Sequence, residues 1–401
     1  MRGGNTLMED VKKYQKAEKA KKKKEELQNI PWYYDGLENL CNRVHPGKQL
    51  LRVSDVRQLS SDTKLFRFTS AKLNKPLAPF RAGQYIGLTV EINGVRTSRP
   101  FSIASSPNQL SYYELGIRMK EDGFVSPFLV ENLKVGDILE ASEPLGNLYY
   151  NPLFHGNDLV FIAGGCGITP FISMLKDISE RNIPLNIWLI FGCLTEKDIL
   201  FREELDDIQE RRSNIHINYI LSEPDTDWKG ECGFISRDVI LKKIGTIKKK
   251  YFYVVGNREM YEYVKEELNA LGISQHRIYF EAFGVPNDIT KVIGWPSDIN
   301  SSNKIQISLE YRRDAVKEKI EFEAKCTEPI LNSLERVIKD KIRIENACRS
   351  GECALCRTRM ISGKIFIPPE VKIREVDKSF GFIHPCISYP LTDIHLDLTL
   401  T

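Results

Sequence analysis

The chain has 401 residues, 42% of them hydrophobic, which is enough apolar material for two or three domains with real cores. Its 57 Lys and Arg residues nearly balance its 54 Asp and Glu residues, and the resulting net charge of +3 excludes a general affinity for nucleic acid. No apolar run approaches the roughly eighteen residues of a membrane-spanning helix, and no secretion signal is recognisable, so we expect neither.

Residues 1–48 are predicted to form a basic helical extension. Within it, residues 9–26 hold eight lysines against five acidic residues, with helix-forming composition and almost no apolar face. Such a segment is typical of a solvated or frayed helix. The alternative is a basic arm that steers an acidic redox partner, and both interpretations stay open.

Residues 49–152 are predicted to form an antiparallel β-barrel domain. Short runs of alternating apolar and polar residues, separated by turn residues, recur through this region. Regular spacing of this kind favours a barrel over a helical fold. The expected strands cover residues 51–60, 63–70, 84–92, 99–105 and 113–119.

In residues 153–284 the alternating pattern gives way to continuous apolar runs, and this region is predicted to form an α/β domain with a parallel sheet. Continuous apolar runs at 159–165, 186–192, 216–222 and 252–256 indicate strands buried on both faces. Between them, residues 168–180, 199–211 and 258–272 have helical patterns. The alternation predicts a parallel sheet covered by helices.

The C-terminal quarter begins after an expected linker, residues 285–303, which holds two prolines and one glycine. Two strands, residues 304–313 and 317–325, and a helix, residues 328–340 with Pro329 in its first turn, are expected next. Residues 304–401 have the right length for one small α+β domain. The predicted architecture is therefore multidomain.

Four cysteines near the C-terminus stand out by their spacing. Cys348, Cys353 and Cys356 read C-x4-C-x2-C and Cys386 follows thirty residues later, the spacing of plant-type [2Fe–2S] ligands. A disulfide framework fits poorly because the chain has nine cysteines, an odd number. Structural zinc favours two paired units, and a Rieske centre needs two histidines where only His384 is near. We therefore predict an all-cysteine [2Fe–2S] cluster.

A second group of motifs suits a flat ring and phosphates. In the tetrapeptide Arg99–Ser102, Arg99 can pair with a pyrophosphate, Phe101 can stack on a ring and Ser102 can bond a ring nitrogen. The glycine turn of Gly123–Ser126 precedes an expected helix, and Gly164–Pro170 lies directly between a strand and a helix. Both turns are typical of phosphate-binding loops.

The order of these motifs resembles that of the ferredoxin–NADP reductase superfamily. The motifs RPFS, GFVS, GGCGITP, YVVGNREM and EAFG come first, and CRSGECALC follows them. The chain therefore resembles flavin reductases with a fused C-terminal plant-type ferredoxin domain, such as hybrid-cluster-protein reductases and phthalate-dioxygenase-type reductases. The resemblance implies a flavin-binding β-barrel, an NAD(P)-binding α/β domain and a β-grasp ferredoxin domain.

The resemblance also implies roles for single residues. In the family, two strand segments and a pyrophosphate loop hold the flavin, and the loop favours FAD over FMN. The residues of this chain that match them are Arg99, Pro100, Phe101, Ser102, Gly116, Ile117, Arg118, Gly123, Val125 and Ser126. The nicotinamide-dinucleotide loops are matched by Gly165, Gly167, Thr169, Pro170, Gly256 and Met260. Phe283 matches the aromatic residue that shields the flavin ring. Ser102, near flavin N5, and Phe283 are the residues expected to influence hydride transfer.

Three departures from the family pattern are informative. Val255 and Asn257 stand where many relatives have cysteine and proline around Gly256, which bears on nicotinamide positioning. Ala354 replaces a common ferredoxin glycine. Leu194 stands where relatives often carry an arginine, and a 2′-phosphate would want arginine nearby, so NADH is favoured over NADPH.

The implied function is an NAD(P)H oxidoreductase that passes electrons from NADH through FAD and a [2Fe–2S] cluster to a protein acceptor. An oxygenase, hybrid-cluster protein or another metalloenzyme could receive them. The alternative is a redox-responsive regulatory or binding protein that carries the same cofactors. Unpaired cysteines and a reducible cluster favour the cytoplasm.

Overall fold

The computed structural model describes residues 32–401, except residues 73–74, 283–285, 287, 314–315, 340, 372 and 400–401. The pattern of contacts between residues divides the chain into two compact units, Met1–Gly47 and Lys48–Thr401. The described part of the first unit is the helix α2 (Trp32–Val44) and the residues after it. The lysine-rich residues 9–26 lie outside the described residues, so their role stays a prediction.

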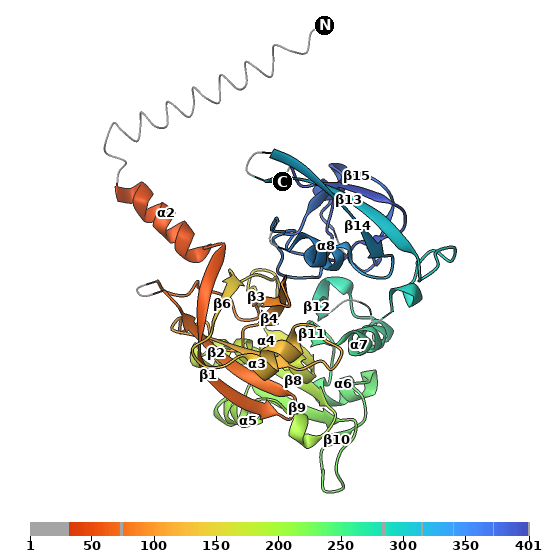
Figure 1. Cartoon of the computed structure of the whole chain (residues 1–401). Helices are drawn as coiled ribbons and strands as arrows, with labels where there is room; N and C mark the ends of the chain where they lie inside the picture. The colour runs from red at the N-terminus through yellow and green to blue at the C-terminus, as the bar shows by residue number, and fades with distance from the viewer. Residues whose placement is uncertain are drawn as a thin grey trace. The chain divides into compact units, whose positions relative to one another are not determined.

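The second unit begins with an antiparallel sheet that curls into a barrel (Figure 1). Six strands lie in the order β4-β3-β6-β1-β2-β5, and a bridge between Ile103 and Leu115 joins the two outer strands. The predicted flavin-type β-barrel is confirmed. Its elements are β1 (Lys48–Ser60), β2 (Thr63–Ser70), β3 (Tyr85–Ile92), β4 (Val95–Ser102), β5 (Tyr113–Arg118), α3 (Ser126–Asn132) and β6 (Ile138–Ser142).

The barrel core is formed by apolar side chains from several strands. In β2 and β5, Phe66, Phe68 and Leu115 are fully buried, and they pack with Ile86 of β3 in one cluster. Alternation with a period of two places one face of each strand in this core. The flavin-type motif 99–102 lies at the C-terminal end of β4 and is thereby held on a rigid sheet.

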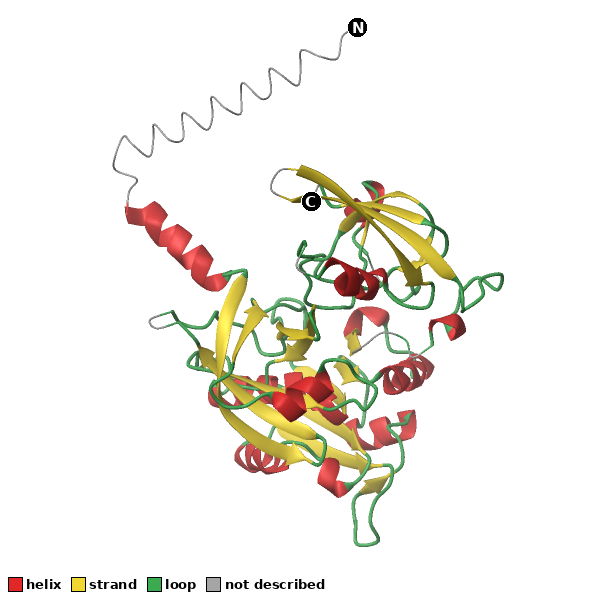
Figure 2. Ribbon diagram, in the orientation of Figure 1, coloured by secondary structure: helices red, strands yellow, loops and turns green. Residues whose placement is uncertain are grey.

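The α/β domain is a fully parallel sheet with helices on both faces (Figure 2). The strands lie in the order β10-β9-β8-β7-β11-β12. Helices α4 and α5 cover one face and α6 and α7 the other, as the continuous apolar runs predict. Its strands are β7 (Asp158–Gly164), β8 (Asn186–Cys193), β9 (Ile215–Leu221), β10 (Glu231–Cys232), β11 (Tyr251–Gly256) and β12 (Ile278–Ala282). Its helices are α4 (Ile168–Glu180), α5 (Arg202–Arg211), α6 (Arg237–Ile244) and α7 (Arg258–Ala270).

The C-terminal domain is a mixed sheet with one main helix packed on it. Strands lie in the order β14-β13-β19-β15-β17, with β13 and β19 parallel, and this α+β arrangement confirms the ferredoxin-type prediction. Pro329 immediately precedes the helix α8 rather than lying in its first turn. The larger elements are β13 (Lys304–Arg313), β14 (Val316–Lys325), α8 (Ile330–Ile338), β15 (Thr358–Ser362), α9 (Glu375–Ser379) and β19 (Ile394–Asp397). The shorter strands are β16 (Ile365–Phe366), β17 (Phe382–Ile383) and β18 (Tyr389–Pro390).

The segment between the last two domains is packed rather than free. Ile289 is buried in a small cluster with Phe366 and Tyr389, and Trp295 stacks edge-on against Phe366. The expected linker therefore adds apolar contacts to the ferredoxin-type domain.

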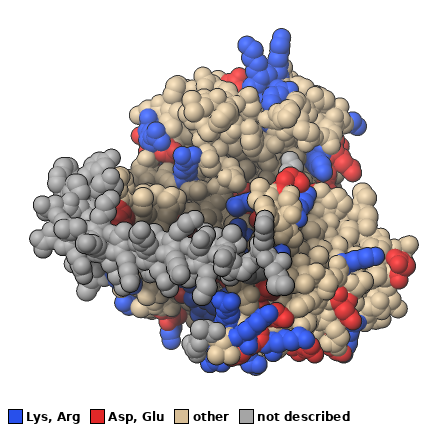
Figure 3. Space-filling view, turned by 90° about the horizontal axis from the view of Figure 1, so that it is seen from above, with Lys and Arg blue, Asp and Glu red and all other residues tan. Residues whose placement is uncertain are grey.

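Two further features concern the surface and the membrane. Among the described residues, no helix is both long enough and apolar enough to cross a bilayer. On the face seen in Figure 3, basic and acidic side chains are interspersed and do not gather into one patch of a single sign. This mixture fits the small net charge.

Candidate redox site

The four predicted ligand cysteines are brought together by two loops. Cys348, Cys353 and Cys356 lie in the loop that joins α8 to β15, and Cys386 lies just after β17. All four are free thiols, and only Cys353 is partly exposed. The backbone N–H groups of Ser350 and Cys353 each donate to Cys348 Sγ at 3.4 Å.

Electrostatics shows how closely the sulfurs approach one another. Hydrogen bonds from the Cys353 and Cys386 thiols hold the pKa of Cys348 far below its usual range. The pKa of Cys386 is raised by the neighbouring Cys348 and Cys356. Cysteine sulfurs gathered in this way suit an iron–sulfur unit, which binds them as thiolates. Among the described residues, no group of three or more His, Cys, Asp and Glu side chains is arranged to hold a single metal ion, so the assignment rests on spacing and on these shared contacts.

The backbone of the ligand loop is strongly curved. Gly351 has φ +81°, and a Cβ there would lie 2.9 Å from Ile387 Cγ1, so this position needs glycine. Arg349 and Ala354 also have positive φ, at 55° and 57°. A left-handed conformation costs a residue with a side chain about 1–2 kcal/mol, so alanine in place of the common glycine is tolerated with strain.

His384 supports the loop and is occupied at both ring nitrogens. It is fully buried, with Nδ1 2.6 Å from the Gly351 carbonyl oxygen and Nε2 2.9 Å from Asp377 Oδ2. Because both neighbours are acceptors, the ring has no free nitrogen for a metal. The Rieske alternative therefore has no histidine ligand, and His384 instead ties α9 to the ligand loop.

The predicted flavin residues lie on adjacent strands. Residues 99–102 end β4, and residues 116–118 end β5. The hydroxyl of Ser102 is buried and has no hydrogen-bond partner. A buried, unpartnered hydroxyl costs free energy unless a ligand completes it, so this position fits a ring nitrogen or carbonyl of a flavin.

Two residues that sequence reasoning missed lie near the same place. Tyr85 is the cross-strand partner of Ser102, and its hydroxyl is also buried without a partner. The buried Oε2 of Glu281 is unpartnered too, and burial, with a smaller contribution from Glu352, raises the pKa of Glu281 to about 8. The register of β3 with β4 could have pointed to Tyr85, and the EAFG motif to Glu281.

Arg99 lies toward the ferredoxin-type domain. Its Nη1 donates to Thr97 Oγ1 and to the Ser98 carbonyl oxygen, each at 2.7 Å. Burial, followed by the nearby charge of Arg349, lowers its pKa to about 10. Pairing of Arg99 with a pyrophosphate stays a prediction.

The expected pyrophosphate turn lies before α3. Ser126 begins α3, and its hydroxyl accepts a hydrogen bond from the Lys120 backbone N–H at 3.1 Å. Val125 is buried in the barrel core. A Cβ on Gly123 would lie 2.8 Å from the Lys120 carbonyl oxygen, so the turn has no room for a side chain.

The predicted dinucleotide loops meet at the carboxyl edge of the parallel sheet. Gly165 and Gly167 form the turn between β7 and α4, which begins Ile168, Thr169, Pro170. A Cβ on Gly167 would lie 2.1 Å from the Val255 carbonyl oxygen, and Met260 Sδ packs against Gly256. Because β7 and β11 are neighbours, both loops lie where open α/β sheets bind ligands.

Arg118 connects the barrel to this edge. Its Nε donates to Asp62 Oδ2 at 2.6 Å, and its Nη1 lies 2.8 Å from where a Cβ of Gly165 would be. The flavin-type and nucleotide-type residues therefore adjoin. Phe283 lies outside the described residues, and its shielding role stays a prediction.

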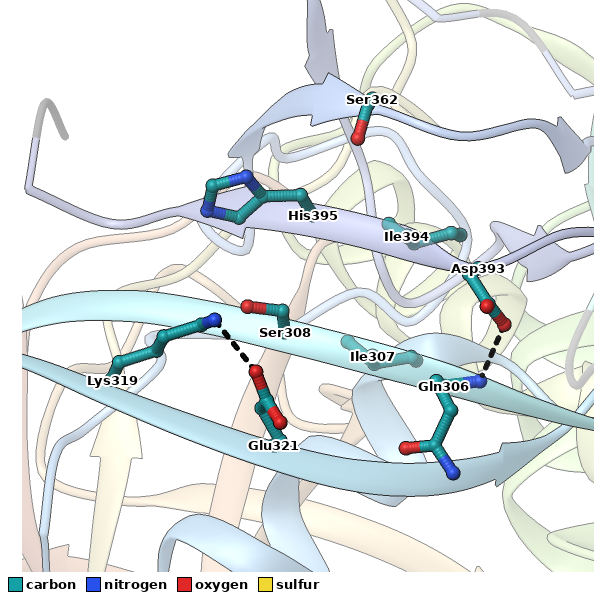
Figure 4. Close-up of a pocket in the computed structure, with 9 residues that line it drawn as sticks. All are labelled: Gln306, Ile307, Ser308, Lys319, Glu321, Ser362, Asp393, Ile394 and His395. Carbon is teal, nitrogen blue, oxygen red and sulfur yellow. Dashed lines mark hydrogen bonds and ion pairs between the residues drawn. The ribbon is translucent and has the colours of Figure 1, made fainter.

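A separate hollow of about 420 Å³ lies on the sheet of the ferredoxin-type domain, away from every predicted site residue. Figure 4 shows Lys319 paired with Glu321 and the Gln306 backbone N–H bonded to Asp393. One lysine and two carboxylates line it, and Lys319 is already paired with Glu321, so its charges select no ligand.

Comparisons with known families match three successive domains. The oxidoreductase FAD-binding domain matches residues 50–150, the oxidoreductase NAD-binding domain residues 161–266, and the 2Fe-2S iron-sulfur cluster binding domain residues 315–391. The matches confirm the predicted cofactors. The solved structure of phthalate dioxygenase reductase, 21% identical, shares the fold over 88% of this chain and 98% of its own, with a TM-score of 0.61.

Curated relatives extend the match to whole chains. The glycine betaine monooxygenase reductase subunit of Chromohalobacter salexigens is 25% identical over 88% of this chain and 95% of its own. The anthranilate 1,2-dioxygenase electron transfer component of Acinetobacter baylyi is 30% identical over 64% of this chain and 73% of its own. The NADH oxidoreductase HCR of Escherichia coli is 25% identical over 79% and 89%.

Proposed function

Because the chain belongs to the ferredoxin–NADP reductase superfamily of flavin reductases with a fused C-terminal [2Fe–2S] domain, we propose that it carries electrons from NADH to an oxygenase component. It is an oxidoreductase with FAD-, NAD- and [2Fe–2S]-binding domains, and it serves a redox partner protein. Two relatives are named for a monooxygenase and a dioxygenase, which supports an oxygenase as the acceptor.

The chain's own residues supply binding and geometry. When bound, FAD takes two electrons together as a hydride and passes single electrons to a [2Fe–2S] cluster. We assign the unpartnered hydroxyl of Ser102 to hold the flavin ring, and the 164–170 turn to hold the dinucleotide phosphates. Cys348, Cys353, Cys356 and Cys386 are assigned as the cluster ligands.

One contact carries this proposal: the flavin-motif strand is hydrogen-bonded to the cysteine loop. Arg349 Nε donates to the Ser98 carbonyl oxygen at 3.0 Å. Ser98 immediately precedes Arg99, and Arg349 immediately follows Cys348. The strand that would hold the flavin and the loop that would hold the cluster are therefore in direct contact, an arrangement suited to electron transfer within one chain.

Replacing Cys353 by serine tests the division of labour. We expect Cys353→Ser to abolish NADH-driven reduction of a protein acceptor while NADH-driven reduction of ferricyanide continues, because the small dye can take electrons from the flavin. Cys232→Ser is the matched control, since Cys232 is exposed and lies in the short strand β10. Loss of both activities in a folded, FAD-loaded Cys353→Ser protein would contradict the proposed electron path.

NADH as the donor and a cytoplasmic location complete the proposal. Leu194, half exposed just after β8, offers no cationic partner for a 2′-phosphate. A much higher kcat/KM for NADPH than for NADH would overturn the preference. All nine cysteines are free thiols, which supports a reducing compartment.

A further inference from the structure

The chain around the first ligand, Cys348, is covered by the flavin-binding strands. A Cβ added to Gly87 of β3 would lie 3.0 Å from Ala347 Cβ, so strand and loop are in close contact there. The Ser98 hydroxyl donates to the Asn346 carbonyl oxygen at 2.8 Å. Residues 346–349 are thus an internal interface, and a second protein cannot occupy the same surface.

The chain around Cys356 and Cys386 contacts α9 instead. His384, two residues before Cys386, bonds Asp377 of α9, and Arg357 Nη1 lies 3.9 Å from the same carboxylate. The Arg357 guanidinium also lies 5.5 Å from the centre of the Phe382 ring. The helix α9 therefore packs directly beside the second half of the ligand set.

This region exposes large apolar side chains. Leu355, between the ligands Cys353 and Cys356, is 45% exposed. Val376 on α9 and Phe380, which directly follows α9, are 66% and 67% exposed. The Phe380 backbone N–H donates to the Val376 carbonyl oxygen at 3.1 Å, so the helical turn continues to Phe380 and the two side chains lie on the same face. Leu355 lies in the ligand loop, and Arg357 and His384 join the chain around the ligands to α9. Exposed apolar groups rimmed by polar residues mark interaction surfaces.

The exposed charges on and beside α9 are mainly positive, while the exposed Glu352 of the ligand loop accepts a hydrogen bond from Asn147 of the barrel region. Arg357, Arg374 and Lys378 are exposed, whereas the buried Asp377 is already bonded to His384. Glu375 is the exposed carboxylate of α9 and pairs with Lys378 at 2.9 Å. An apolar centre with a cationic rim is complementary to a partner whose own apolar patch is ringed by carboxylates.

We propose that the α9 patch, made of Leu355, Val376 and Phe380 with the rim Arg357, Arg374 and Lys378, docks the electron-accepting protein through an acidic surface. The inference rests on the proposed function and deepens it. Electrons enter at the Cys348 side, which the flavin-binding strands cover. They leave past Cys356 and Cys386, which are themselves buried, toward the exposed side chains of the α9 patch. The flavin domain need not move away for the acceptor to bind.

The test uses the full chain with FAD and cluster, NADH as donor, and two protein probes of opposite charge: acidic cytochrome b5 and basic cytochrome c. We expect the double variant Arg374→Glu/Lys378→Glu to lower kcat/KM for cytochrome b5 about tenfold or more at low salt and to flatten its salt dependence. Phe380→Glu should lower it as well. Ferricyanide reduction and the visible spectrum of the cluster should match those of the unaltered chain.

Lys317→Glu/Lys319→Glu is the matched control, because both lysines are exposed on the distant strand β14. It changes the net charge by the same amount and should leave cytochrome b5 kinetics unchanged. If the α9 variants reduce cytochrome b5 like the unaltered chain, or if the β14 control loses as much, the docking surface is wrong while the reductase function stands. An unaltered chain that reduces ferricyanide but neither cytochrome overturns the proposed delivery and the docking surface together.

Discussion

Arg349 is predicted to hold the cluster loop against the flavin strand. Its guanidinium forms a buried ion pair with Glu335 of α8, the two side chains being 10% and 7% exposed. It also donates to Thr97 Oγ1 at 2.7 Å and to the Ser98 carbonyl oxygen at 3.0 Å. Replacing it with glutamine removes the charge and shortens the reach across this interface.

The size of the effect follows from burial. Removing one partner of a buried ion pair costs about 3–5 kcal/mol, because the other charge stays buried and unpaired. Glu335 keeps hydrogen bonds from Thr97 at 3.0 Å and Asn346 at 3.2 Å, so the lower end, about 3 kcal/mol, applies. At about 1.4 kcal/mol per factor of ten, the contact between loop and strand becomes about a hundredfold less favoured.

The assay is anaerobic stopped-flow reduction by NADH, with the flavin and cluster absorbance followed separately. In Arg349→Gln, we expect flavin reduction at the normal rate and cluster reduction slowed at least tenfold. Arg343→Gln is the control: Arg343 pairs with Glu140 across the same interface, but its side chain is 37% exposed, so its loss should cost less than about 1 kcal/mol. Cluster reduction at the unaltered rate in Arg349→Gln, with the cluster intact, would refute the reasoning.

Three other positions give independent predictions. Gly87→Val should overpack β3 against Ala347 and lower the free energy of unfolding by about 1–3 kcal/mol. Absorbance should show slower cluster reduction without loss of FAD, and normal cluster reduction would contradict the close contact. Ala354→Gly should relieve the strain of a left-handed φ of 57°. Glycine also gives the unfolded chain more freedom, so the net gain in the free energy of unfolding should be about 0.5 kcal/mol. A lower melting temperature of the cluster chromophore would contradict this prediction. The pKa of Glu281 is raised by burial to about 8, so the folded chain binds a proton that the unfolded chain releases above about pH 4.5, and stability should fall as pH rises from about 5 to 8. Glu281→Gln should remove that part of the decline in thermal melts, and an unchanged profile contradicts a buried carboxyl.

Much of the fold was predictable because its signals are local. The continuous apolar run of residues 159–165, followed by glycines and a helical pattern, predicts β7 and α4 with only a few residues' error. The barrel and the ferredoxin-type domain follow from equally local alternation. Pro329 was placed one position too far inside its helix, since helix ends depend on packing as well as on composition.

The candidate site was predictable only in part. Cysteine spacing and glycine turns are short-range features, so they predict the cofactor types, which the family matches confirm, while the individual ligands and loop residues stay predictions. Tyr85 is not predicted because nothing next to it in sequence marks it, and Glu281 is not predicted because its motif, EAFG, points first to Phe283. Tyr85 gains its meaning from its register opposite Ser102, and the pKa of Glu281 from burial in the folded chain.

The sequence by itself determined which cofactors this chain can hold, because the cysteine spacing and the phosphate-binding turns are short patterns of neighbouring residues. Only the tertiary structure decided how those centres face each other. Residues about 250 positions apart, Ser98 and Arg349, meet in one hydrogen bond, and that contact covers one side of the cysteine quartet while leaving α9 exposed on the other. The physical reason is that packing between segments far apart in the sequence decides which side of the cluster site is covered and which side is open to a partner. A local pattern of residues cannot predict such packing.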